Sequence, residues 1–189
     1  MRLFIAIDID DAVKAAIVKL QQRMKQSLRN GNGLKWVEPE QMHLTLKFLG
    51  EVNDGRLDEI AETINIACFE KRAFEFELSA VGTFGRPSKV LWLGSEKQSG
   101  ELLALVDSVE LALQELGFEK ENRPFSAHLT LARVKDNCIE KNLRRVVNEN
   151  QKVEIPMVLV GSVCLYKSQL TLTGPVYTLL RKIELKKDF

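Results

Sequence analysis

Both histidines of the chain begin a copy of the same four-residue motif. Residues 43–46 and residues 128–131 each read His-Leu-Thr-Leu. Histidine has an unperturbed pKa of about 6.5, so it can gain or lose a proton near neutral pH. Two imidazoles, each followed two residues later by a hydroxyl, predict a site with two proton-transfer groups and two hydrogen-bond donors.

The spacing within each motif fits a β-strand. Side chains alternate between the two faces of a strand, so His43 shares a face with Thr45, and His128 shares one with Thr130. Two such strands placed together would surround one pocket with two imidazoles and two hydroxyls. One imidazole could take a proton from an attacking oxygen while the other protonates a departing oxygen. The threonines could donate hydrogen bonds to phosphate oxygens, and such a site needs no metal.

Two other interpretations of these residues stay open at this level. A lone histidine on a strand is more often structural than catalytic, and threonine is common in strands because of its β propensity. A zinc site would need a third ligand from a Cys, His, Asp or Glu side chain, and no spacing in the chain proposes one. The matched pair of motifs favours the catalytic interpretation over both.

The composition is typical of a globular protein. The 189 residues are 45% hydrophobic and 28% charged, and the net charge of +1 gives no general argument for nucleic-acid binding. The three cysteines, Cys68, Cys138 and Cys164, include no Cys-x-x-Cys pair, which argues against a disulfide framework and a structural zinc site. No apolar run approaches the ~20 residues that span a bilayer, and the apolar start is too short for a signal peptide. We expect a cytoplasmic monomer with no membrane association.

No Pro-, Ser- or Gly-rich linker divides the chain, so we predict one folding unit over residues 1–189. The hydrophobic patterns predict helices over 10–29 (ended by the segment 30–33), after Gly55, over 99–116 and near 139–149. They predict strands over 2–8, 34–37, 42–50, 73–82, 89–94, 127–134, 152–158, 160–167 and 175–184. Each half thus has a His-Leu-Thr-Leu strand followed by a helix, which predicts a duplicated α+β unit whose halves face each other across a groove.

Further segments outside the two motifs carry a family resemblance. They are Arg2-Leu3-Phe4-Ile5-Ala6-Ile7, Trp36-Val37, Lys47-Phe48-Leu49-Gly50, Val90-Leu91-Trp92-Leu93-Gly94, Arg123-Pro124-Phe125, Ala132-Arg133 and Leu165-Tyr166-Lys167-Ser168. With them the chain, over nearly its whole length, closely resembles the 2H phosphoesterase superfamily. Within that superfamily it is most similar to the bacterial and archaeal RNA 2′,3′-cyclic phosphodiesterases, also called 2′-5′ RNA ligases. One departure is Ala127, which stands where family members often have Pro.

This resemblance implies a bilobal fold with two antiparallel β-sheets that face a central groove, with helices packed outside. It implies hydrolysis of 2′,3′-cyclic phosphate ends of RNA to 2′-phosphomonoesters, with His43 as the general acid and His128 as the general base. The residues alone leave this assignment open, because the two motifs are alike. Run in reverse with a 5′-hydroxyl in place of water, the site would form a 2′-5′ linkage without ATP, so no cofactor is expected.

Two cations beside the motifs are candidates for phosphate binding. Lys47 lies four positions after His43, on the same face if the alternation continues. Arg133 lies five positions after His128, on the opposite face unless a bulge or a strand end turns it back.

Three aromatic side chains are candidates for stacking on RNA bases, as in proteins that bind single strands. Trp36 and Tyr166 each lie next to a predicted turn or a polar residue. Phe48 belongs to the same group, although packing in the core is the favoured interpretation for it.

Two alternative functions would use the same residues. One is a module that binds RNA ends or nucleotides without turnover, although binding alone does not require two titrating groups. The other keeps the chemistry and changes the substrate to small cyclic nucleotides or 2′-5′ linked oligonucleotides.

Overall fold

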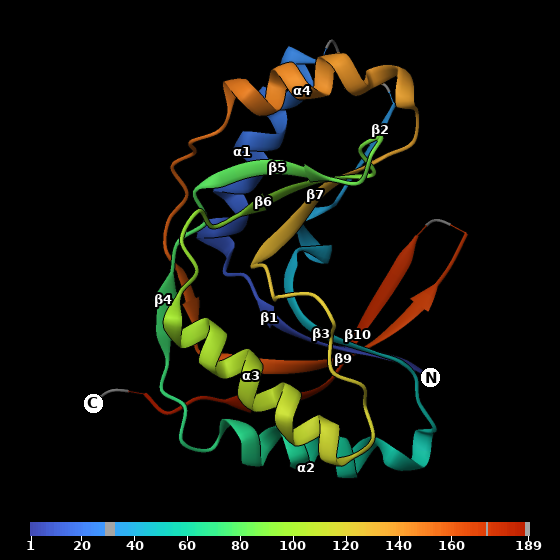
Figure 1. Cartoon of the computed structure of the whole chain (residues 1–189), viewed down its shortest axis with the longest axis vertical. Coiled ribbons are helices and arrows are strands. Elements are labelled where there is room, and N and C mark those ends of the chain that lie inside the picture. Colours follow the sequence, from blue (N-terminus) through green and yellow to red (C-terminus); the bar gives the residue numbers. More distant parts are fainter. Residues whose placement is uncertain (29–32, 173, 188–189) are drawn as a thin grey trace.

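Two four-stranded antiparallel sheets form the centre of the molecule, and four α-helices cover them in the computed structural model, which describes residues 1–28, 33–172 and 174–187 (Figure 1). The lower sheet of Figure 1 has the strand order β10-β9-β1-β3, and the upper sheet has the order β2-β7-β6-β5. A smaller sheet joins β4 to β8. This arrangement confirms the expected α+β fold with two antiparallel sheets.

The strands are β1 (Arg2–Asp8), β2 (Leu34–Trp36), β3 (His43–Glu51), β4 (Phe74–Phe76), β5 (Ala80–Phe84), β6 (Val90–Gly94), β7 (His128–Val134), β8 (Val158–Val160), β9 (Ser162–Leu170) and β10 (Pro175–Glu184). The helices are α1 (Asp11–Ser27), α2 (Leu57–Cys68), α3 (Gly100–Glu115) and α4 (Glu140–Glu149), with short 3-10 turns η1 (Pro39–Gln41), η2 (Asp54–Arg56) and η3 (Asn137–Ile139). Figure 1 shows α2 and α3 beneath the lower sheet and α1 and α4 over the upper sheet.

Capping side chains explain where two of the helices begin. Asp10 accepts a 2.8 Å hydrogen bond from the backbone N–H of Val13 at the start of α1. Ser99 accepts a 3.2 Å bond from the N–H of Leu102 at the start of α3. A cap of this kind contributes about 1 kcal/mol. In each case the bonded N–H belongs to a buried apolar residue, so the cap also fixes which face of the helix meets the core.

Two predicted strands differ from the structure. The strand expected over 73–82 is two strands, because β4 pairs with β8 whereas β5 pairs with β6. The strand expected over 152–158 is wrong, since β8 begins at Val158 and the N–H of Val153 bonds to the carbonyl of Ser79 instead. The segment 30–33, expected to end the first helix, lies mostly outside the described residues. The other predicted elements are present, with ends shifted by a few residues.

The first histidine strand contains a β-bulge. Thr45 pairs with Ala6 of β1 and Lys47 pairs with Ile5, which leaves Leu46 as an extra residue. An extra residue reverses the alternation beyond it. Leu46 and Lys47 therefore both point to the helix side of the lower sheet, and both are buried. We call the opposite side, which carries the first histidine and Thr45, the His43 face.

The second histidine strand contains a bulge at the same place in its motif. Thr130 pairs with Trp92 of β6 and Ala132 pairs with the preceding residue of β6, so Leu131 is extra. Beyond the bulge, Arg133 returns to the side of the upper sheet that carries the second histidine, which we call the His128 face. The sequence placed Arg133 on the opposite face unless a bulge turned it back, and the structure has such a bulge at Leu131.

Lys47 does not lie on the His43 face, so the phosphate contact expected for it is wrong. Its ammonium group forms a 2.6 Å ion pair with Glu110 of α3 and donates a 2.8 Å hydrogen bond to the carbonyl of Glu119. The side chains of the ion pair are 2% and 6% exposed. Glu110 also accepts a bond from the N–H of Glu121. These contacts join the middle of β3 to α3.

A buried amide joins the other bulge to α1. Gln21 donates hydrogen bonds from Nε2 to the carbonyls of Leu131, at 3.0 Å, and Val37, at 2.9 Å. The N–H of Val37 also donates to the Leu131 carbonyl. Buried backbone carbonyls need such partners, and here the bonds also fix α1 against the upper sheet.

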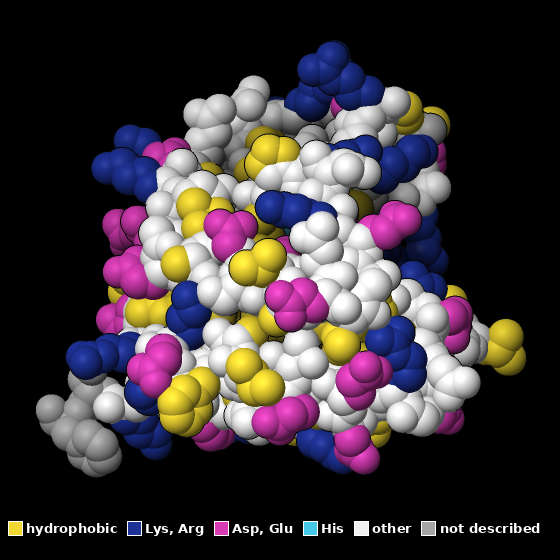
Figure 2. Space-filling model, turned by 60° about the horizontal axis from the view of Figure 1, so that its bottom comes forward, with side chains coloured by type: hydrophobic (Ala, Val, Ile, Leu, Met, Phe, Trp, Pro, Cys, Tyr) yellow, Lys and Arg dark blue, Asp and Glu magenta, His cyan; other side chains and the backbone are white. Residues whose placement is uncertain are grey.

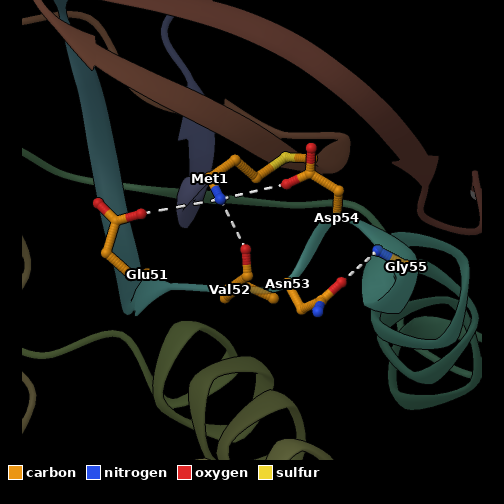
Figure 3. A network of polar contacts seen from close by, with 6 residues as sticks. All are labelled: Met1, Glu51, Val52, Asn53, Asp54 and Gly55. Carbon is orange, nitrogen blue, oxygen red and sulfur yellow. Dashed lines mark hydrogen bonds and ion pairs between the residues drawn. The ribbon is translucent and has the colours of Figure 1, made fainter.

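The start of β1 is tied to the end of β3 by the amino group of Met1 (Figure 3). This group donates a 2.6 Å bond to the carbonyl of Val52 and a 3.2 Å bond to Asp54, and it lies 3.7 Å from the carboxylate of Glu51. The contacts hold two neighbouring strands together at the end far from His43.

The outer surface over α2 and α3 carries single apolar side chains among charged ones, and neither histidine is visible on it (Figure 2). Ile66 of α2 and Leu111 of α3 are exposed. Isolated exposed apolar residues are ordinary for a protein surface. Within the described part of the chain, no helix has the length and apolar character to cross a membrane.

Removing one partner of the buried ion pair tests the assignment of Lys47. We expect Lys47→Ala to lower the free energy of unfolding by about 3–5 kcal/mol, because Glu110 then stays buried without its cation. The double variant Lys47→Met with Glu110→Leu should regain most of that loss. Urea unfolding at pH 7 measures both, and a loss below about 0.5 kcal/mol for Lys47→Ala contradicts the assignment.

Candidate active site

His43 is the first residue of β3, where it pairs with Asp8 at the end of β1. Three aromatic rings surround its imidazole. The ring centroid of Phe4 lies 4.8 Å away, that of Tyr177 lies 5.0 Å away at an interplanar angle of 88°, and that of Tyr166 lies 6.4 Å away. The first histidine is therefore enclosed by residues of β1, β9 and β10.

Burial controls the protonation of His43. It lowers the pKa of the imidazole from 6.5 to about 4, while a hydrogen bond to the backbone of Gln41 and the negative charge of Asp8 act in the opposite direction. The imidazole is thus neutral at pH 7 in the free protein. Because a backbone carbonyl can only accept, the bond to Gln41 means that one ring nitrogen carries a proton aimed at the backbone.

His128 is the first residue of β7 and has the same kind of backbone contact. Its Nδ1 donates a 2.7 Å hydrogen bond to the carbonyl of Ser126, two residues earlier, as Gln41 is two residues before the first histidine. This bond leaves Nε2 free to accept or donate a proton. Phe84 of β5 packs edge-on against the ring, with centroids 4.8 Å apart at 86°.

The two motif threonines lie on the histidine faces, as expected. Thr45 pairs with Ala6 and Thr130 pairs with Trp92, and both threonines are half-buried. The indole of Trp92 lies over Gly82, where a Cβ atom would collide with the ring. The absence of a side chain on Gly82 therefore gives the His128 face a flat aromatic surface beside Thr130.

Arg133 reaches from the upper sheet toward the aromatic cluster of the lower sheet. Burial raises the pKa of the Tyr177 phenol, and the positive charges of Arg133 and Arg2 act against that shift. Both guanidinium groups therefore lie close enough to Tyr177 to affect it, although they come from β7 and β1. The strands β3 and β7 are also in contact with each other.

The predicted base-stacking residues have three different environments. Phe48 is 61% exposed on the His43 face beside Phe4, so the core position favoured for it is wrong. Tyr166 stacks on Phe4 at 5.4 Å, and its hydroxyl donates a 2.6 Å hydrogen bond to Asp8. Trp36 pairs with Ala132 on the helix side of the upper sheet.

Trp36 is thus misplaced for stacking on a base at the histidines. The bulge at Leu131 puts Ala132 on the helix side, and its partner Trp36 lies there too. The ammonium group of Lys25 on α1 sits 5.2 Å from the centre of the indole. Packing between α1 and the sheet explains this tryptophan.

Four residues at the site were missed by reasoning from the sequence: Arg2, Asp8, Phe84 and Tyr177. Asp8 and Arg2 lie on the strand paired with β3, so a correct pairing of the two predicted strands could have found them. Phe84 and Tyr177 carry no local signal, because their contacts with the histidines depend on tertiary structure. In the described ranges, no group of three or more His, Cys, Asp or Glu side chains is arranged to hold a metal ion.

Comparison with known proteins agrees with the repeated motif. The model of one family, LigT like Phosphoesterase, matches the chain twice, over residues 7–92 and 93–177. The chain belongs to the LigT-like phosphoesterase family. Each of the two matched segments contains one His-Leu-Thr-Leu motif, so the duplication inferred from the motifs extends over the whole matched region.

Several relatives in this family carry the name RNA 2′,3′-cyclic phosphodiesterase. The chain is 38% identical to the protein from Archaeoglobus fulgidus over 186 residues, which cover 97% of this chain and 100% of the relative. It is 34% identical to the protein from Thermotoga maritima over 184 residues, 95% of this chain and 93% of the relative.

Two solved structures share the fold. The structure of TT0787 from Thermus thermophilus matches with a TM-score of 0.78 and 28% identity, covering 100% of both chains. The structure of Escherichia coli LigT complexed with 3′-AMP matches with a TM-score of 0.74 and 25% identity, covering 97% of both chains.

The burial of His43 predicts a specific loss of stability in acid. The folded protein binds a proton at this group less readily than the unfolded chain does, so acid favours the unfolded chain. The contribution of neutral His43 to the free energy of unfolding is complete above pH 6.5 and is lost as pH falls toward 4. By pH 4 the loss reaches about 3 kcal/mol. Urea unfolding at pH 7 and at pH 4 measures this loss. Between these two pH values, the free energy of unfolding of His43→Gln should fall by about that much less than that of the wild type. Equal losses contradict the prediction.

Proposed function

We propose that this phosphoesterase hydrolyses the 2′,3′-cyclic phosphate at RNA ends to a 2′-phosphomonoester, with His43 as general acid and His128 as general base and without a metal ion. The names of the relatives support the substrate, and the nucleotide in the LigT structure supports a nucleotide ligand. The observation that carries the proposal is the matched backbone bond of the two imidazoles, each with a threonine on its own face.

The proposed reaction is an in-line displacement at phosphorus. His128 holds its proton on Nδ1 against Ser126, so its Nε2 accepts the proton of the attacking water. The new P–O bond forms as the bond from phosphorus to O3′ breaks. His43 donates a proton to the departing O3′, which becomes a hydroxyl and leaves the phosphate on O2′. With a 5′-hydroxyl of RNA in place of the attacking water, the same displacement would form a bond from phosphorus to O5′ as the bond to O3′ breaks, and so join RNA ends by a 2′-5′ linkage.

The threonines and Arg133 would hold the negative charge of the transition state. Thr45 and Thr130 present hydroxyl donors on the two histidine faces, where they suit the non-bridging phosphate oxygens. Arg133 adds a guanidinium group that can bind two such oxygens at once. The exposed ring of Phe48 offers a stacking surface for a base.

The low pKa of His43 sets a condition on the acid role. A group with a pKa of about 4 carries almost no proton at pH 7 in the free protein. An anionic phosphate within hydrogen-bond distance favours the charged imidazolium and raises the pKa. The proposal therefore requires the substrate itself to supply the charge that protonates His43.

Hydrolysis is tested with an RNA oligomer that ends in a 2′,3′-cyclic phosphate, incubated with the protein in excess EDTA. We expect a 2′-phosphate product, identified by mass and by phosphate position. A 3′-phosphate would show that the acid and base roles are assigned wrongly. An unchanged oligomer with turnover of a cyclic mononucleotide would move the substrate to small nucleotides, and binding without any turnover would support a binding module.

Substitutions test the roles of the four motif side chains. We expect His43→Asn and His128→Asn each to lower kcat by about 10²–10⁴-fold, because each removes one proton transfer. Thr45→Ala and Thr130→Ala should lower it by about 10²-fold by removing a charge-stabilising donor. Thr63→Ala on α2 is the matched control, since its hydroxyl bonds to the Glu59 carbonyl within the helix. Full activity in either histidine variant contradicts the mechanism.

The effect of phosphate on His43 is measured by NMR titration with a nucleoside 2′-monophosphate. We expect its pKa to rise by about two units or more in the complex. The acid role is excluded if His43 stays neutral at pH 6 when the site is saturated.

A further inference from the structure

We propose that Tyr177 is a positioning residue for proton transfer at His43, and that the β9–β10 hairpin is a strap that holds it there. The effect on reaction rate rests on the proposed function, whereas the effect on the imidazole can be measured without turnover.

Tyr177 closes one side of the space around the first imidazole. Its ring stands perpendicular to His43, with centroids 5.0 Å apart, and also packs edge-on against Phe4 at 5.1 Å and 72°. Phe4 in turn lies 4.8 Å from His43 at an interplanar angle of 34°. Edge-to-face contacts of this kind fix the orientation of a ring and exclude water from it. His43 is thus held between the ring of Phe4 and the edge contact with Tyr177.

Gln41 contacts both the imidazole of His43 and the β9–β10 hairpin. Gln41 receives the hydrogen bond of the His43 ring through its backbone, and its side-chain Nε2 donates a 2.8 Å hydrogen bond to the carbonyl of Pro175. Pro175 is the first residue of β10, two positions before Tyr177. One residue of η1 therefore sets both the imidazole and the strand that covers it.

The tip of the hairpin leans toward the upper sheet. Figure 1 shows β9 and β10 rising from the lower sheet as a projecting arm. Thr171 and Gly174 close the turn through paired backbone bonds and a 2.7 Å bond from the Thr171 hydroxyl. The ammonium group of Lys35 on β2 lies 3.2 Å from the position that a Cβ of Gly174 would take. The turn of the hairpin at Gly174 thus lies close to a side chain of the upper sheet.

The two histidines differ in which element supplies the aromatic ring that stands perpendicular to the imidazole. Phe84 makes nearly the same perpendicular contact with His128, at 4.8 Å and 86°, but it comes from β5 within the upper sheet. The corresponding ring on His43 comes from the end of a projecting hairpin, whose Val176 and Leu179 are exposed. A change in the hairpin therefore alters the surroundings of His43 and leaves those of His128 as they are.

The charged and titratable groups around His43 predict the direction of that change. Asp8 on β1 favours the protonated imidazole, and Tyr166 and Tyr177 are neutral phenols at pH 7. Arg2 and Arg133 lie close enough to Tyr177 to act against the rise in the pKa of its phenol. Because burial is the largest influence on His43, opening the Tyr177 side to water should raise its pKa toward 6.5.

The decisive experiment is an NMR titration of the histidine rings in Tyr177→Ala, Tyr177→Phe and the wild type. The chain has two histidines, so the His128→Asn variant assigns both sets of signals. We expect Tyr177→Ala to raise the pKa of His43 by about one unit or more, and Tyr177→Phe, which keeps the ring, to leave it within about 0.3 unit. The signals of His128 should not move in either variant.

Two further variants test the proposal even if Tyr177→Ala fails to fold. Gln41→Ala removes the bond to Pro175 but keeps the backbone contact, so we expect a shift of His43 in the same direction as for Tyr177→Ala. Val176→Ala is the matched control, since its side chain is 48% exposed on the hairpin next to Tyr177. It should leave the titration of His43 unchanged.

Kinetics then connect the strap to the reaction. On a cyclic-phosphate-ended RNA, Tyr177→Ala should lower kcat about tenfold with a smaller change in KM, because the imidazole loses the ring contact that orients it even though its protonation becomes easier. The limb of the pH–rate profile that follows His43 should move with its pKa. Tyr177→Phe should retain the activity. An unchanged pKa and pH profile in both Tyr177→Ala and Gln41→Ala overturns the strap, as does an equal shift in Val176→Ala. If the wild type shows no turnover, the proposed function is overturned. The NMR titration still shows whether Tyr177 controls the pKa of His43.

Discussion

The β-bulge at the last residue of each His-Leu-Thr-Leu motif is the constraint on which the site depends. Leu46 and Leu131 are one-residue bulges at the same place in two copies of one motif, and each reverses the alternation of the strand beyond it. The motif leucines therefore stay in the core while Phe48 and Arg133 return to the histidine faces. Without the bulges, both of these side chains would point into the helix layers.

Two like motifs acquire unlike environments from the elements around them. Both imidazoles bond to a backbone group two residues earlier and meet an aromatic ring edge-on. His43 is also covered by Phe4 and by a hairpin fastened at Gln41, and this burial makes its protonated form unfavourable. A lowered pKa by itself favours the proton-accepting form of His43, so the acid role proposed for it depends on the negative charge of a bound phosphate.

Buried polar contacts hold the helices against these strands. The Lys47–Glu110 ion pair joins β3 to α3, and Gln21 of α1 bonds to the carbonyl of Leu131 in β7. Each contact lies at or next to a bulge, where the regular ladder of backbone bonds is interrupted. The ion pair adds little net stability over an apolar pair of the same shape, but loss of one partner is costly. Its position favours a role in fixing the geometry of β3.

The sequence by itself determined the repeated motif, the α+β class, most elements and the placing of His and Thr on one strand face, since these follow from local spacing and propensity. It placed Lys47 wrongly and left Arg133 open, because alternation cannot be counted through an unseen bulge. The tertiary structure alone decided that Trp36 packs on α1, that Phe48 is exposed and that Tyr177 covers His43. Those outcomes depend on which strands pair and how a distant hairpin folds back, and contacts between remote segments leave no periodic signal in the chain.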